Sequence, residues 1–120
     1  MRTRLRTGLV VAALTGVAAA GPAAAITGEE WQRLPAPART AYVTAIVDAW
    51  SSFALVKESL GSSDAGITVF SELATCVRDR GITTAQVLGL VERYTESQPG
   101  LRGKDMPDIV FAALGEACRR

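Results

Sequence analysis

The sequence predicts an all-α protein, a small bundle of about five helices with one disulfide, in a single domain over residues 26–120. Three observations predict this class. Apolar side chains recur every three to four residues in several stretches, as they do on the buried face of an amphipathic helix. Glycine and proline residues separate these stretches. No run alternates between polar and apolar residues as a half-buried strand does, and no hairpin dipeptide such as Asn-Gly occurs.

The first expected helix is short. Thr27 and Glu30 have the spacing of a capping box, in which each side chain accepts a hydrogen bond from the other residue's backbone amide. Trp31 and Leu34 follow on one face. The prolines at positions 35 and 37 end this helix in a stiff turn.

The longest expected helix covers residues 38–60 and ends at Gly61, a residue suited to the left-handed position after a helix. Trp50 lies at the centre of its apolar stripe, so we expect Trp50→Ala to destabilise the domain by about 3–5 kcal/mol. Trp31 lies near the start of the domain, and we expect its replacement to cost less. The stripe follows a 3.6-residue repeat and consists of Tyr42, Ile46, Ala49, Trp50, Phe53, Val56 and Leu60.

Three more helices follow a flexible loop at residues 61–66. The third is expected over residues 68–80 and ends at Gly81. The fourth is capped by Thr83 or Thr84 and ends before Pro99, and the fifth starts at residue 105 with a proline in its first turn. The expected buried faces are Phe70, Leu73, Ala74 and Val77; Val87, Leu88, Val91 and Tyr94; and Met106, Ile109, Val110, Ala113, Leu114 and Ala117.

The first 25 residues predict a secretory signal peptide. Three arginines without an acidic residue precede an apolar run over residues 9–20, and small residues follow up to Ala25. About 12 apolar residues span only ~18 Å as a helix, which is short of the ~30 Å hydrocarbon core that a membrane anchor must cross. We expect cleavage between Ala25 and Ile26, with cleavage after Ala20 as the alternative. The mature form then has no membrane anchor and resides in the periplasm or outside the cell.

The two cysteines are interpreted in that oxidising compartment. An even number of cysteines in a small secreted domain predicts pairing, so we expect a Cys76–Cys118 disulfide; the alternative is two free buried thiols. The bridge closes a loop of about 42 residues, which is worth ~4 kcal/mol in the chain-entropy model. A redox enzyme would use a close pair such as Cys-x-x-Cys, and the sequence has none.

Charge and composition exclude several classes of function. Without the three leader arginines the chain has ten basic and twelve acidic side chains, a net charge of −2, so it is not a polybasic nucleic-acid binder. Histidine is absent, and two cysteines cannot form a four-ligand zinc site by themselves. No nucleophile–base pair or phosphate-binding glycine loop can be assembled. We therefore predict no catalytic residue, cofactor or metal.

Asp48 is the one unusual polar residue, because it interrupts the longest apolar helix. It shares a narrow face with Ala41, Ala45 and Ser52. We favour a place at the edge of the helix, or an ion pair with Arg39 or Arg78, over a functional carboxylate, since an unpaired buried charge is costly.

The second half of the chain carries a resemblance to a known family. Cys76 is followed by a turn that ends in Ile82-Thr83, then by a helix with Gln86, Val91 and Tyr94, Gln98-Pro99, and a last helix that ends at Cys118. With Tyr42-Val43 and Asp48, this pattern resembles the Tai (type VI amidase immunity) and resistance-associated-protein family of small secreted immunity proteins. It covers most of residues 39–118. An earlier cysteine pair of the family is missing, and its place holds Arg39-Thr40-Ala41.

The resemblance implies a non-enzymatic protein that binds and neutralises a protein partner, namely a secreted cell-wall-degrading effector. The candidate contact is the loop with Gly61, Ser62, Ser63 and Asp64. The alternative functions are a periplasmic stress chaperone or another helical binding protein, and an enzyme is the least favoured reading.

Overall fold

The computed structural model describes residues 25–119, and the predicted leader up to residue 24 lies outside this range. The described residues form five α-helices and one 3₁₀ turn, which confirms the predicted all-α class. Their only strand-like pairing is a single bridge between Thr27 and Asp105. The elements are α1 (Gly28–Gln32), α2 (Ala36–Leu60), α3 (Ala65–Asp79), α4 (Thr84–Ser97), η1 (Pro99–Leu101) and α5 (Met106–Arg119).

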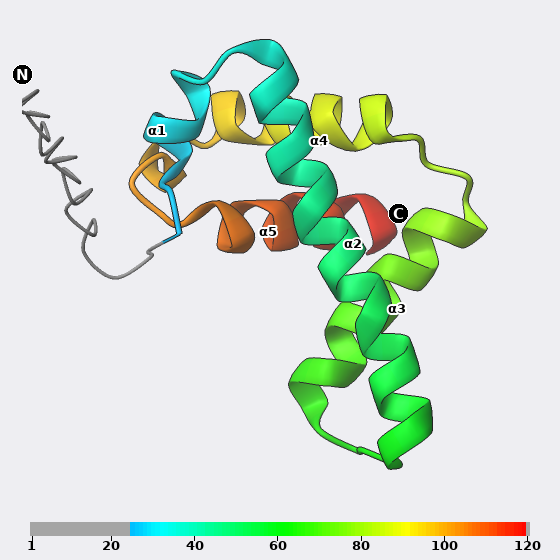
Figure 1. The fold of residues 1–120 in the computed structure, drawn as a ribbon. Helices are drawn as coiled ribbons and strands as arrows, with labels where there is room; N and C mark the ends of the chain where they lie inside the picture. The colour runs from blue at the N-terminus through cyan, green and yellow to red at the C-terminus, as the bar shows by residue number, and fades with distance from the viewer. Residues whose placement is uncertain (1–24, 120) are drawn as a thin grey trace, which may run out of the picture.

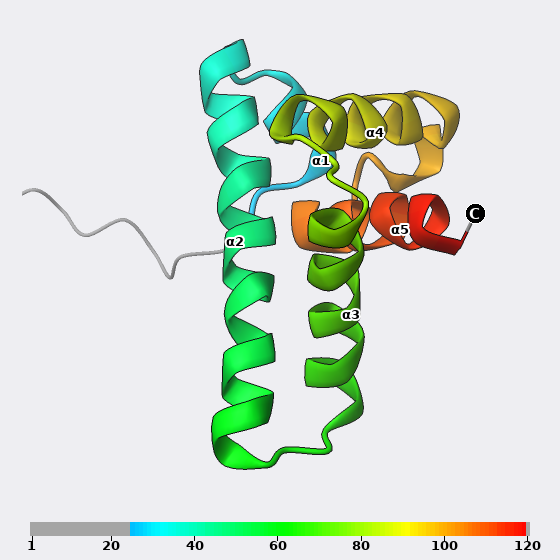
Figure 2. The same cartoon turned by 90° about the vertical axis from the view of Figure 1, so that its right-hand side faces the viewer.

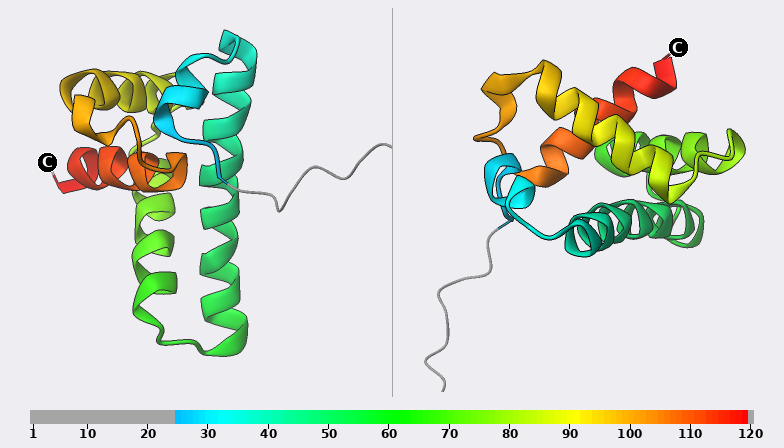
Figure 3. Two further views of the ribbon diagram at one scale, coloured as in Figure 1. Left: turned by 90° about the vertical axis from the view of Figure 1, so that its left-hand side faces the viewer. Right: turned by 90° about the horizontal axis from the view of Figure 1, so that it is seen from above.

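The helices are arranged as a long hairpin with two helices packed across one end. α2 and α3 run antiparallel, and α4 and α5 lie across the hairpin near its open end (Figures 1 and 2). The short α1 lies between the start of α2 and the start of α5 (Figure 3). The closed end of the hairpin therefore extends well beyond α4 and α5 (Figure 2).

The core lies where α5 meets the other helices. Its predicted apolar face is confirmed at Met106, Ile109, Val110, Ala113 and Leu114, which are all buried, whereas Ala117 is half-buried. Their partners come from every other α-helix and are Trp31, Val43, Trp50, Leu73, Ala74, Val87 and Val91. α5 is thus the element around which the helices assemble.

An aromatic cluster marks the edge of this core. Trp50 of α2 and Phe70 of α3 have ring centroids 5.0 Å apart, and Phe111 of α5 lies edge-on to Phe70 at 5.5 Å. Phe53 completes the cluster at 5.8 Å from Phe70. The rings hold α5 against the hairpin. We call residues 54–68, beyond this cluster, the arm.

The predicted stripe of α2 is only partly buried. Trp50 is buried, as expected, but so is Val43, which the stripe did not include, whereas Ala49 and Leu60 are exposed. Leu60 is exposed because only α3 accompanies the second half of α2, so the last side chains of the stripe extend past their partners. α2 also starts two residues earlier than predicted, since proline is tolerated in a first helical turn.

The turns around α3 follow from three residues. Gly61 ends α2 and Gly81 follows α3, both with positive φ (60° and 62°), the backbone conformation that favours glycine. α3 begins at Ala65, three residues before the predicted start. The reason is Asp64, whose carboxylate accepts a hydrogen bond from the Ile67 amide at 3.1 Å and so caps the helix.

The N-terminal segment is joined to residues 102–106 by backbone hydrogen bonds. The Gly28 amide donates to Lys104 at 3.0 Å, and the Met106 amide donates to Ile26 at 2.8 Å. The predicted capping box of α1 is present, and so is one at Thr83 of α4. The Thr27 backbone amide and the Thr27 hydroxyl both donate to the Glu30 carboxylate. These hydrogen bonds, the one from the amide first, lower the pKa of that carboxyl group.

Gly28 is required by close packing rather than by a turn. A Cβ atom there would lie 2.6 Å from Cδ1 of the buried Ile109 and 3.3 Å from the Arg102 carbonyl oxygen.

We expect Gly28→Ala to lower the free energy of unfolding by roughly 1–3 kcal/mol, the usual cost of overpacking. Urea melts measure it, with Gly115→Ala as the control. A Cβ at Gly115 meets nothing within 4 Å, so that change should stabilise α5 slightly. Equal melts for both variants and the parent would contradict the proposed contact.

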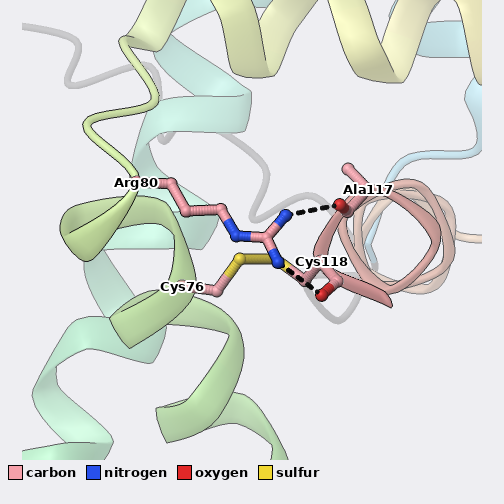
Figure 4. The surroundings of a disulfide bond; sticks show 4 residues. All are labelled: Cys76, Arg80, Ala117 and Cys118. Atoms are coloured by element: carbon pink, nitrogen blue, oxygen red, sulfur yellow. Dashed lines mark hydrogen bonds between the residues drawn. A yellow bond between two sulfur atoms is a disulfide. The ribbon is translucent and has the colours of Figure 1, made fainter. Parts of the chain in front are cut away.

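The predicted disulfide is confirmed. Cys76, near the end of α3, bonds to Cys118 in the last turn of α5, with Cα atoms 6.2 Å apart. Arg80 reinforces the junction, because its guanidinium donates to the carbonyl oxygens of Ala117 and Cys118 at 3.0 Å each (Figure 4). A cation at these carbonyls also suits the negative end of the α5 dipole. Two independent contacts therefore hold the end of α5 to the end of α3.

Candidate partner-binding surface

The predicted contact loop lies at the tip of the arm, at the end of the hairpin farthest from α4 and α5 (Figures 1 and 2). Gly61, Ser63 and Asp64 are exposed and Ser62 is half-buried. The structure therefore presents this loop to solvent on a projecting element. Asp64 has a local structural role as well, since it caps α3.

Two leucines of the arm add apolar surface to this tip. Leu60, next to the loop, is 75% exposed, and Leu55, just over one turn earlier, is 66% exposed. Their exposure exceeds that of the other exposed large apolar residues, Val69 and Phe111. The sequence analysis missed Leu55. It is a large apolar residue outside the predicted apolar stripe of α2, and this position could have identified it as exposed.

A second feature is a groove where α2, α3 and α4 meet, with a volume of about 240 Å³. Its apolar lining includes Val47 of α2, Val77 of α3 and Val87 of α4. Asp48 and Arg78 also line it. Sequence reasoning could not find this groove, because it depends on how three helices cross.

Asp48 lies at the exposed edge of α2, together with Ala41, Ala45 and Ser52. This placement agrees with the interpretation that the sequence favoured, but the suggested ion pairs do not form. Arg39 pairs instead with Glu92 of α4 at 3.2 Å, and Arg78 pairs with its neighbour Asp79 at 3.1 Å. Within residues 25–119, the Asp48 carboxylate has no ion-pair partner.

Within residues 25–119, no three His, Cys, Asp or Glu side chains are grouped so that they could hold a metal ion. Both cysteines are in the disulfide. Across the same range, no helix combines the length and the apolar character needed to traverse a bilayer.

Comparisons with family models, curated proteins and solved structures found no match for this chain. The resemblance to secreted immunity proteins therefore stays a prediction.

Proposed function

We propose that this protein is a small secreted binding protein of the periplasm that neutralises a protein partner, a cell-wall-degrading effector, and that it catalyses no reaction itself. The observation that carries the proposal is the projecting arm, whose tip combines an exposed loop with Leu60. Active sites of hydrolases are concave, and a convex tip with an apolar side chain is the complementary shape. The pattern of residues 39–118 that resembles immunity proteins supports the same function.

Secretion is part of the proposal. It is supported by the leader pattern up to Ala25 and by the disulfide, which suits an oxidising compartment. Ala25 is exposed, whereas the Ile26 carbonyl already accepts a hydrogen bond from Met106. Cleavage between Ala25 and Ile26 would therefore retain the described residues of the N-terminal segment that hydrogen-bond to the fold.

The test uses the exported protein, with its first residue determined by intact mass. It is used to capture partners from periplasmic extracts of cells that deliver or receive cell-wall hydrolases. Any hydrolase recovered is then assayed with increasing amounts of the protein. Loss of hydrolase activity at about one equivalent supports occlusion of its active site. Turnover of a cell-wall substrate by the protein alone would overturn the proposal.

Leu60→Asp should weaken binding to that hydrolase by tenfold or more, about 1.4 kcal/mol, because it places a charge in the centre of the contact. Thermal stability should change little, since Leu60 is exposed. The matched control is Gln98→Asp, which adds the same charge to an exposed position after α4, outside the arm and the groove. Titration calorimetry measures both. Equal affinities of the two variants for the hydrolase would show that the tip is not part of the interface.

A further inference from the structure

We propose that the groove between α2, α3 and α4 binds one long cationic side chain, a lysine or arginine, that the protein partner presents. This inference rests on the proposed function only in that a partner protein supplies the side chain. It names a chemistry for the partner that the arm alone does not specify. Three features of the groove support it.

The polar groups that α2 contributes to the groove are hydrogen-bond acceptors. The Thr44 hydroxyl donates its proton to the Thr40 carbonyl at 2.8 Å, and the Ser51 hydroxyl donates to the Val47 carbonyl at 3.1 Å. Toward a ligand, both hydroxyl groups can therefore act only as hydrogen-bond acceptors. Asp48 lies between them on the same helical face and, as a carboxylate, also only accepts. Lysine and arginine side chains carry donors and no acceptor, so they complement this set.

The charge that has no ion-pair partner at the groove is negative. Arg78 is the only cation among the groove's lining residues, and its Nε donates to Asp79 at 3.1 Å. Asp79 thus offsets Arg78, and the charge of Asp48 is left over. At the start of α4, the amides of Gln86 and Val87 are both bonded to Thr83. The Asp48 carboxylate is therefore the unpaired charge that a ligand of the groove meets, and it favours a cation.

The walls of the groove suit the carbon chain of such a residue. Val47, Val77 and the buried Val87 come from three different helices and surround the space. Lysine and arginine pack their methylene groups on apolar surface while their charged end stays at the polar rim. A volume of about 240 Å³ offers room for one such side chain.

The face of α2 that lines the groove continues into the arm. On α2, Leu55 follows Asp48 by seven residues and Ser51 by four, so the three side chains share one helical face. A partner that covers this face contacts Leu55 and reaches the groove from one direction. The arm and the groove can therefore belong to one interface.

The test needs no partner. The oxidised, exported protein is labelled for NMR and titrated with Nα-acetyl-lysine methylamide and Nα-acetyl-arginine methylamide. Nα-acetyl-norleucine methylamide is the uncharged control of similar shape. We expect saturable shifts of amides in Thr44–Ser51 and in the Val77–Ile82 turn with the cations, and smaller shifts with norleucine. Equal shifts with norleucine, or no saturable shifts with either cation, would overturn the proposal.

Asp48→Asn should weaken binding of the cationic compounds by about three- to tenfold, as expected for a partly exposed charge pair. Glu58→Gln is the matched control, because it removes a carboxylate from an exposed position of the same helix outside the groove. Unchanged affinity in Asp48→Asn contradicts the role of the carboxylate. If the protein inhibits a hydrolase but its groove binds neither cationic compound, only this inference is refuted. If the groove binds the cationic compounds but the protein inhibits no hydrolase, only the proposed function is refuted.

Discussion

Replacing Trp31 with alanine is expected to lower the free energy of unfolding by about 3–5 kcal/mol, the usual range for truncating a buried tryptophan. The Trp31 side chain is fully buried, with 0% exposure, compared with 6% for Trp50. Its indole N–H donates to the Arg39 carbonyl at 3.2 Å, and the Arg39 guanidinium lies 5.6 Å from the centre of its ring. Trp31 thus packs α1 against α2 and α5, and its loss leaves a cavity and removes the indole hydrogen bond to α2.

A larger loss for Trp31→Ala than for Trp50→Ala, which we expect from their burial, would reverse the order that the sequence suggested. Urea melts of Trp31→Ala and Trp50→Ala give the comparison, and Trp31→Phe serves as the control. The phenylalanine fills much of the same space but cannot donate to Arg39, so it should lose only about 1–2 kcal/mol. A Trp31→Ala loss below that of Trp31→Phe would contradict the buried packing of α1.

Removing the disulfide is expected to cost about 4 kcal/mol, since Cys76 and Cys118 close a loop of 42 residues. Against a total stability of roughly 5–10 kcal/mol for a domain of this size, that is a large share. The melting temperature of Cys76→Ala/Cys118→Ala should fall by well over 10 °C, because about 1 kcal/mol corresponds to roughly 4–8 °C.

Differential scanning calorimetry of the parent protein, with and without reductant, checks this value. Reduction of the double variant is the control, since it has no disulfide to lose. At temperatures below the transition, the helical circular dichroism of the double variant should stay close to that of the parent, because Arg80 still bonds to the carbonyl groups of residues 117 and 118. A melting temperature within a few degrees of the parent would show that the bridge contributes little.

The candidate site was only partly accessible to sequence reasoning. The loop at Gly61–Asp64 was expected to be exposed, because glycine, serine and aspartate between two helical patterns predict a turn. The exposure of Leu60 was not expected, since the helical repeat assigned it to the buried stripe. A repeat states which side chains share a face, but it does not state where the neighbouring helix stops.

What the sequence alone determined is local. The helix class, the capping box at Thr27, the turn at Gly61 and the apolar face of α5 depend on residues within a few positions of each other. The pairing of the cysteines needed only their number and an oxidising compartment.

The tertiary structure decided everything that depends on how the helices cross. It buried Trp31 beneath Arg39, made Gly28 a contact with Ile109, and gave Arg80 its place on the end of α5. It also made the arm a projection and formed the groove beside Asp48. The physical reason is that side-chain periodicity specifies which face of a helix is apolar, whereas the packing of residues distant in sequence decides what covers that face and where it is left open.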